Sequence, residues 1–462
     1  MSVRLASAES AAAGALLIRK QKMTETNLPG SFGMPGLGAT IPILFDPLRF
    51  ARNHYHKYGT TFKTRFLGKP TAVLLGAEAQ QRVLGATTTD TQFATMGGYS
   101  FLIPFIGRTS LLMLDGQEHS MQRKLITPVF HSHHYGAYVE RINHIIDSVR
   151  ATWQVGQTLQ FYKDSREITF RMANSLVLSV EAGPEYEQLQ RDWVTLFAGI
   201  TDPLQRDLPM TVYGRAMRAK QKVDAFLRET IARHRAKPYT DMLSFLLEAQ
   251  HEDGSPLTEE ELLNHTRFLL FASYDTAAST LSWALLEILQ NPHVLRKLLE
   301  ETHAERGDAP VSVEEIMQMP YMDAVIKETL RLHPATGFLS RGLNTPLEHN
   351  GYTIPAGWNV MIMLSFTHRM SEYFAEPEQF IPERFLAPRS EEKQTPYAWV
   401  GFGAGAHNCI GMGIAHVEIK TILARLLRCY QMTLIPGQNM KPLYVPINRP
   451  KSGTLMKIAQ RV

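Results

Sequence analysis

Hydrophobic residues in this chain recur mainly every three or four positions, which is the spacing of amphipathic helices. From about residue 117 to 305 this pattern is nearly continuous. It is interrupted only at proline and glycine positions, namely Pro128, Gly156, Gly183, Pro203, Pro238 and Gly254. Two of the predicted helices are long, one over about 259–289 and one over 412–428. The pattern therefore predicts that helices make up most of the structure.

Short strands are predicted in two places. Residues 62–66 and 71–75 flank a Gly-Lys-Pro turn, and strand-like positions return around 351–363. With the helical majority, these strands predict a mostly α protein with small β sheets, an α+β fold. No low-complexity linker divides residues 28–462, so we expect a single large domain. Residues 28–38 form a turn-rich entry to it. Residues 1–27 contain a short alanine-rich run among basic residues, and we expect a disordered or loosely helical leader there.

The composition is ordinary for a globular protein, with 44% hydrophobic residues, 20% charged residues and a net charge of +4. No apolar run approaches the roughly 20 residues of a transmembrane helix. No basic cluster is interleaved with aromatic residues, so we expect neither a membrane anchor nor a nucleic-acid site. The two cysteines, Cys409 and Cys429, flank one predicted helix, too far apart for a disulfide. We expect a soluble, cytoplasmic monomer, with organelle import as an alternative because the leader is basic.

Cys409 lies in the run Phe402–Gly411, directly before the helix predicted over 412–428. A thiolate is a strong ligand for iron, and the N–H groups that open a helix favour the anionic form of a nearby cysteine. Gly405 and Gly411 lack a Cβ atom, so the backbone can approach a flat cofactor closely. His407 can donate a hydrogen bond to a cofactor carboxylate. By residue type alone, however, a buried and inert cysteine is the more common case.

The spacing of this run resembles the haem-binding loop of the cytochrome P450 family, in which Phe, Gly, a basic residue, Cys and Gly stand at set intervals. Those positions are filled here by Phe402, Gly405, His407, Cys409 and Gly411. The resemblance extends from about residue 28 to the C-terminus and implies the family's α+β fold. It also implies a haem b cofactor with Cys409 as the axial ligand of the iron, which favours cleavage of the O–O bond.

A second motif pairs Glu328 with Arg331, three residues apart and therefore on one side of a predicted helix. Such pairs are common on protein surfaces and contribute little there. In the family they meet an arginine of a later segment, which corresponds to Arg384 in this chain. The resemblance thus implies a buried charge network, with a structural role, behind the cysteine loop.

A third motif lies inside the long helix predicted over about 259–289. Ala272 and Thr276 are four residues apart and share one face of that helix. The segment resembles the family's oxygen-activation motif, although Ser273 stands where glycine is usual. The resemblance implies that Thr276 and Asp275 are catalytic and deliver protons to bound oxygen, while Ala272 leaves room beside the cofactor.

Haem carries two carboxylates, and the resemblance suggests four donors for them. His119 and Arg123 are four residues apart on a predicted helix, Arg341 follows the Glu328 motif, and His407 lies in the cysteine loop. Cationic donors suit carboxylates because charge-assisted hydrogen bonds are strong. Each of the four residues, taken singly, is more often a solvated surface residue.

These motifs imply a haem-thiolate monooxygenase that inserts one oxygen atom from O2 into a small lipophilic substrate. The chain has no reductase domain and no convincing flavin or nicotinamide motif, so we expect electrons from a separate ferredoxin or flavodoxin with its reductase. Lys420 and Arg425, on the helix after Cys409, are candidates for the docking face of that donor. A solvated helix face is an equal alternative for these two residues.

Apolar residues at the family's substrate-lining positions suggest a terpenoid, retinoid, sterol or fatty acid as substrate. They are Phe101, Phe105, Phe271, Ala335 and Phe338, and core packing would explain them equally well. Arg108 is a candidate partner for a substrate carboxylate. Three other functions stay open: a peroxygenase that uses H2O2, a hydroperoxide isomerase of the same fold, and a non-enzymatic haem-based gas sensor.

Overall fold

The computed structural model describes residues 27–86, 91–202, 205–237 and 239–461. The leader expected over residues 1–27 therefore lies outside the described residues, except for its last position. Helices dominate the described part, as predicted. They are α2 (Thr40–Phe45), α3 (Pro47–Tyr58), α4 (Ala77–Leu84), α5 (Thr95–Tyr99), α6 (Ile103–Ile106), α7 (Gly116–Ile126), α8 (Tyr135–Arg150), α9 (Phe161–Leu178), α10 (Pro184–Ala198), α11 (Val212–Ala236), α12 (Met242–Glu248), α13 (Glu259–Gln290), α14 (Pro292–Glu301), α15 (Val313–Met317), α16 (Pro320–Leu332), α17 (Leu364–Thr367), α18 (Glu391–Gln394) and α19 (Met412–Cys429).

The strands form small sheets. The largest has five strands in the order β1-β2-β8-β5-β3, and only the β2–β8 pair is parallel. The strands are β1 (Thr61–Phe66), β2 (Lys69–Leu74), β3 (Phe93–Ala94), β4 (Thr158–Gln160), β5 (Leu339–Leu343), β6 (Leu347–His349), β7 (Tyr352–Ile354), β8 (Asn359–Ile362), β9 (Tyr430–Leu434), β10 (Pro442–Leu443), β11 (Arg449–Pro450) and β12 (Leu455–Gln460). The prediction of a mostly α protein with small β sheets is confirmed.

Sequence analysis did not predict β5, because its sequence Leu-Ser-Arg-Gly-Leu lacks the β-branched and aromatic residues typical of strands. The strand forms because it lies between β8 and β3, which satisfy its backbone groups on both edges. The β3 partner is far away in the sequence. Long-range pairing therefore overrides the local pattern in this segment.

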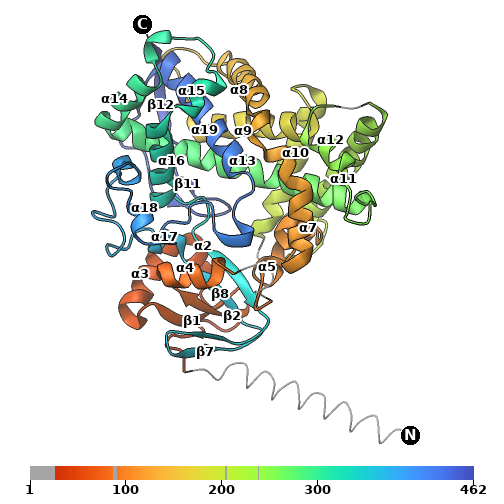
Figure 1. The fold of residues 1–462 in the computed structure, drawn as a ribbon, viewed down its shortest axis with the longest axis vertical. Helices are drawn as coiled ribbons and strands as arrows, with labels where there is room; N and C mark the ends of the chain where they lie inside the picture. The colour runs from red at the N-terminus through yellow and green to blue at the C-terminus, as the bar shows by residue number, and fades with distance from the viewer. Residues whose placement is uncertain (1–26, 87–90, 203–204, 238, 462) are drawn as a thin grey trace, which may run out of the picture.

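Helix α13 organises the helical part of the molecule. Figure 1 shows it crossing the centre, with the five-stranded sheet at one end of the molecule. Its first turn is closed by a capping box, in which Thr258 and Glu261 satisfy each other's backbone N–H groups. The helix is buried on nearly all sides, and α9, α16 and α19 pack against it. A helix enclosed in this way is a rigid platform for a site.

One stretch of α13 is an exception. Residues Phe271, Ala272, Ser273, Asp275 and Thr276 are partly exposed, although the turns before and after them are buried. The middle of the central helix therefore borders open space. In the described part of the chain, no helix is long and apolar enough to cross a lipid bilayer.

Candidate functional site

The Cys409 loop connects the short 3₁₀ turn Gly405–His407 to the start of α19. The N–H group of Cys409 donates to the carbonyl of Phe402 across 2.8 Å, which closes the loop. Gly403 lies in the left-handed region at φ 71°, a conformation that favours glycine. The Cys409 residue is exposed, and none of the residues from 401 to 413 is fully buried. The loop therefore leaves the Cys409 side chain accessible from outside.

Burial and the neighbouring donors shift the pKa of the Cys409 thiol in opposite directions. Crowding by the loop raises the pKa of the thiol, while the N–H of Gly411 and the charge of Arg123 lower it. The donors therefore favour a thiolate, but they do not fully overcome desolvation in the isolated chain. A cation at the sulfur would supply the missing stabilisation, because metal coordination deprotonates thiols.

Gly405 has a different reason to be glycine than the one predicted. It has φ 67°, and a Cβ atom there would lie 1.9 Å from the carbonyl oxygen of Leu84 at the end of α4. The close approach that requires glycine is thus between the loop and α4. Gly411 does adjoin the sulfur, since a Cβ atom there would lie 4.0 Å from the Sγ of Cys409.

The four predicted carboxylate donors come from three segments and converge beside the loop. The rings of His119, from α7, and His407 stack with centroids 3.9 Å apart. Arg123, one turn along α7, donates to the backbone and side-chain oxygens of Asn408 at 2.9 and 2.7 Å. Arg341, from β5, is buried and close enough to influence His119 and His407. The structure therefore brings together residues that are far apart in the sequence.

His119 is the clearest sign that this cluster serves a ligand. It is almost fully buried, and its Nδ1 atom has no hydrogen-bond partner among the described residues. Burial, followed by the charges of His407 and Arg123, lowers the pKa of His119 to about 3, so the ring is neutral. An unpaired buried polar atom is costly. The exposed sulfur, the convergent donors and this unpaired nitrogen together fit a flat cofactor that carries carboxylates.

Two further members of the cluster were missed by sequence analysis. Asp115, the residue before α7, lies 3.4 Å from the Nε2 atom of His407. Its carboxylate also accepts from the N–H of Thr95, at 2.9 and 2.8 Å. Burial raises the pKa of Asp115, but His407 and Thr95 outweigh it and hold the pKa below its ordinary value. The signal was present in the sequence, because Asp115 precedes His119 by four residues.

On α13, Ala272 and Thr276 lie in the partly exposed stretch, as their shared face predicts. The hydroxyl of Thr276 donates to the carbonyl of Ala272 across 2.8 Å. The hydroxyl of Ser273 reaches the carbonyl of Leu270 only at 3.4 Å. The main hydroxyl–carbonyl bond in this stretch therefore belongs to Thr276.

Asp275 points to other partners than Thr276. Its carboxylate lies 2.7 Å from the Nε atom of Arg166 and 3.4 Å from the hydroxyl of Tyr162, both on α9. Burial lowers the pKa of the Arg166 guanidinium, but the neighbouring Asp275 outweighs this effect, and the pKa lies above its ordinary value. Asp275 thus joins α13 to α9 through its ion pair with Arg166.

The second motif forms a buried network. Both carboxylate oxygens of Glu328 accept from Arg331, at 2.6 and 2.9 Å, and one of them also accepts from Arg384 at 3.2 Å. All three side chains are fully buried. The remaining donors of Arg331 reach the carbonyls of His368, Pro377 and Gln379. Every charge of the triad is therefore paired, which a buried ion pair requires.

The five candidate substrate residues do not form one group. Phe271 and Phe101 are partly exposed, and Phe271 stacks on Phe197 with centroids 4.6 Å apart. Phe105 is fully buried against Phe197 and Tyr213, an arrangement typical of core packing. Phe338 packs against Phe66 in a separate cluster near the sheet, and Ala335 is partly exposed before β5.

The docking face predicted around Lys420 and Arg425 is wrong. Both residues are almost fully buried. Lys420 pairs with Asp323 at 3.0 Å, and Arg425 pairs with Asp147 and Asp308. They lie in a part of α19 that is buried on all sides, and each is paired with a carboxylate. Arg108, by contrast, is exposed, and its contact is with the sulfur of Met96 at 3.8 Å.

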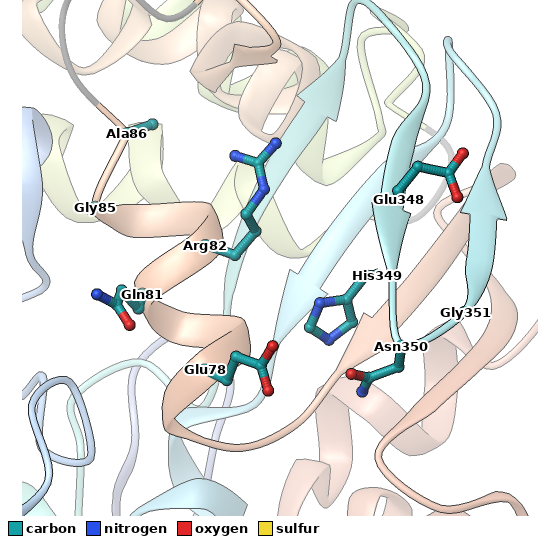
Figure 2. A pocket seen from close by; sticks show the side chains of 9 residues that line it. All are labelled: Glu78, Gln81, Arg82, Gly85, Ala86, Glu348, His349, Asn350 and Gly351. Atoms are coloured by element: carbon teal, nitrogen blue, oxygen red, sulfur yellow. The ribbon is translucent and has the colours of Figure 1, made fainter.

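A polar cleft of about 640 Å³ lies elsewhere, between α4 and the hairpin of β6 and β7. Figure 2 shows Glu78, Gln81 and Arg82 along α4, opposite His349 and Asn350 on the hairpin. None of the predicted site residues lines it. The cleft is therefore separate from the Cys409 site.

Comparisons with known proteins agree with the geometry. The cytochrome P450 family model matches residues 43–458. The chain is 31% identical to the putative cytochrome P450 120 of Synechocystis sp., with 93% of this chain and 96% of the relative covered. It is 29% identical to cytochrome P450 26B1 of Mus musculus, with 93% and 86% covered. The solved structure of retinoic-acid-bound cyanobacterial CYP120A1 matches with a TM-score of 0.85 at 29% identity, covering 94% of this chain and 99% of that one.

The family match spans most of the chain, the fold agrees with a solved member over nearly its whole length, and the cysteine loop carries the family's spacing. This chain therefore belongs to the cytochrome P450 family and is a haem-containing monooxygenase.

Proposed function

We propose that this protein oxidises a lipophilic carboxylic acid, such as a retinoid, terpenoid or fatty acid, at a haem b held by Cys409. The observation that carries the haem site is the convergence of an exposed Cys409 sulfur with four donors and the unpaired nitrogen of His119. Bound haem supplies the activation of O2, in which one oxygen atom enters the substrate and the other leaves as water. Two electrons and two protons balance that reaction.

The donors around the loop have separate tasks in this proposal. Arg123 and Arg341 carry fixed charges for the haem carboxylates. His119 is neutral, so it offers the cofactor a hydrogen bond but no charge. His407 is oriented by Asp115, which lies 3.4 Å from its Nε2 atom. This arrangement supports one defined orientation of the cofactor, because the donors for its carboxylates are gathered in one cluster beside the Cys409 loop.

Protons reach the oxygen side of the site along α13. The Thr276 hydroxyl lies in the exposed stretch and can hold a water or a proton there while it is anchored on the Ala272 carbonyl. Asp275 serves this hydroxyl indirectly. Its carboxylate must leave Arg166, 2.7 Å away, and take up a proton from solvent before it can pass that proton inward, so the ion pair acts as a gate.

The substrate class is supported by three observations. One solved relative, cyanobacterial CYP120A1, has retinoic acid bound, and retinoic acid is an apolar molecule that ends in a carboxylate. Phe101 and Phe271 offer partly exposed aromatic surface, and Arg108 is exposed on the loop that follows α6. Accessible aromatic surface together with an exposed arginine suits a long hydrocarbon that ends in a carboxylate.

Electrons come from a separate ferredoxin or flavodoxin with its reductase in this proposal, and the protein acts as a cytoplasmic monomer. Its docking surface does not include Lys420 or Arg425, because both are neutralised inside the protein.

Two measurements test this function. The reduced protein with carbon monoxide should show the red-shifted band of a thiolate-ligated haem, and Cys409→Ser should lose that band. Titration with retinoic acid should shift the haem spin state, and Arg108→Gln should weaken the apparent affinity about tenfold, while the affinity for retinol should be unchanged. Turnover with H2O2 but not with O2 and reductant would instead support a peroxygenase.

A further inference from the structure

Helix α13 carries six serine and threonine hydroxyls, and most of them are buried. The buried ones belong to Thr266, Ser279, Thr280 and Ser282. The other two belong to Ser273 and Thr276, which lie in the partly exposed stretch that borders open space. Two hydroxyls of this helix, and not Thr276 alone, are therefore placed where protons are needed.

The Ser273 hydroxyl differs from those of the three threonines, because its proton has no well-formed bond. Thr266, Thr276 and Thr280 each donate to the carbonyl four residues earlier, at 2.6, 2.8 and 3.0 Å. Ser273 reaches the carbonyl of Leu270 only at 3.4 Å, which is beyond the usual range of an O–H···O bond. The Ser273 proton can therefore be donated to a group outside the helix.

Thr276 has the complementary property. Its proton is already donated to the Ala272 carbonyl, so its oxygen atom can accept a further hydrogen bond but cannot donate one. Ser273 and Thr276 are three residues apart, and the Cβ atoms of residues with this spacing on a helix lie about 5–6 Å apart. One water molecule at normal hydrogen-bond distance from both hydroxyls spans that separation, accepting from Ser273 and donating to Thr276.

Two structural roles for a serine at this position explain less. A serine hydroxyl bends a helix when it bonds tightly to a carbonyl of the preceding turn, but the contact of 3.4 Å is too long for that. Serine also stabilises a helix relative to glycine, but alanine does so more and brings no polar group. A partly exposed hydroxyl with an unused proton, in a helix that is otherwise mostly buried, is better explained by a partner in the site.

We propose that Ser273 is a positioning residue for proton delivery, which holds a water molecule together with Thr276. The inference rests on the proposed function, because the protons are used at the haem site. The water gives one proton to the site and takes the Ser273 proton in exchange, and a proton from solvent restores the hydroxyl, so neither group is consumed. This water provides a proton even while Asp275 stays paired with Arg166, 2.7 Å away.

The test is infrared spectroscopy of carbon monoxide bound to the reduced, haem-loaded full chain. Ser273→Ala removes only the hydroxyl, and Ser273→Thr keeps one. The C–O stretching band should move to higher frequency in Ser273→Ala, because a hydrogen bond from the held water weakens the C–O bond in the wild type. In D2O the wild-type band should shift, since the donated proton exchanges, whereas the Ser273→Ala band should not. Ser273→Thr should resemble the wild type in both respects.

The matched control is Ser148→Ala on α8, since the exposed Ser148 also directs its hydroxyl to the carbonyl three residues earlier, that of Ile145 at 2.8 Å. It should leave the C–O band unchanged. The proposal is overturned if Ser273→Ala keeps the wild-type band and its response to D2O, or if Ser148→Ala changes the band equally. A wild type without the red-shifted absorption band would instead contradict the haem site itself, so the two failures are distinguishable.

Discussion

At the scale of single residues, the site depends on groups whose surroundings set their charge. His119 is neutral because it is buried beside other cationic groups, and Asp275 is tied to α9 because it pairs with Arg166. Exposed residues of the same types, such as His56, lack such surroundings. Three-dimensional surroundings, more than residue identity, therefore decide what each of these side chains can do.

The Thr276 hydroxyl provides the first test at this scale. We expect Thr276→Ala to lower product formed per electron pair on the order of 10²-fold, with O2 consumption continuing and peroxide released, because proton delivery is lost. Thr276→Ser should keep most of the coupling. Thr280→Ala is the matched control, since Thr280 makes the same bond to a carbonyl one turn later but is buried. Unchanged coupling in Thr276→Ala would exclude this hydroxyl from the proton path.

Glu418 gives a pH-dependent prediction. This residue of α19 is buried, its Oε1 atom has no partner among the described residues, and burial raises the pKa of its carboxyl to about 8. The folded protein therefore keeps a proton that the unfolded chain releases above about pH 4.5. The free energy of unfolding should then fall as pH rises from about 4.5 to 8, by about 3–5 kcal/mol.

Glu418→Gln should remove this contribution to the pH dependence, and chemical denaturation at several pH values measures it. The variant should be more stable than the wild type at about pH 8 and nearly equal to it at about pH 4.5. Glu252→Gln is the control, because Glu252 is exposed and its replacement should leave the pH profile unchanged. Parallel profiles for wild type and Glu418→Gln would show that Glu418 is solvated or paired.

At the scale of elements, the Glu328 network joins α16 to the turn at Pro382–Phe385. Arg331→Leu should lower the free energy of unfolding by about 3–5 kcal/mol, because Glu328 would keep a buried charge with only Arg384 beside it. Thermal unfolding measures the change. Arg191→Leu serves as the control, since Arg191 and Glu187 form an exposed pair at 3.7 Å that should contribute less than about 1 kcal/mol.

The same scale shows what could be predicted. The long helices α13 and α19 were predicted to within one residue at each end, because apolar spacing and caps are local properties. β5 was missed, and it is the strand that carries Arg341 into the site. Lys420 and Arg425 were wrongly predicted to lie on the surface. A charged residue is usually exposed, but these two are paired with carboxylates and can therefore be buried.

At the scale of the whole molecule, the cofactor should link parts that are otherwise separate. The donors come from α7, β5 and the Cys409 loop, and α13 lies beside them. Removal of haem should therefore lower the melting temperature and broaden the transition, since a ligand bound only to the folded state stabilises all the elements it contacts. Differential scanning calorimetry of the haem-free and haem-loaded protein checks this, with haem added back as the control. Equal melting temperatures would contradict a shared site.

The sequence by itself determined the helical majority and the family, and it led to the proposal of Cys409 as the thiolate ligand. Those properties depend on the spacing of residues that are close together in the sequence, as in the stretch Phe402–Gly411. Only the tertiary structure decided that Asp115 and Thr95 contact His407 and that Asp275 pairs with Arg166. These contacts join distant segments, and burial and pairing exist only once the segments have packed.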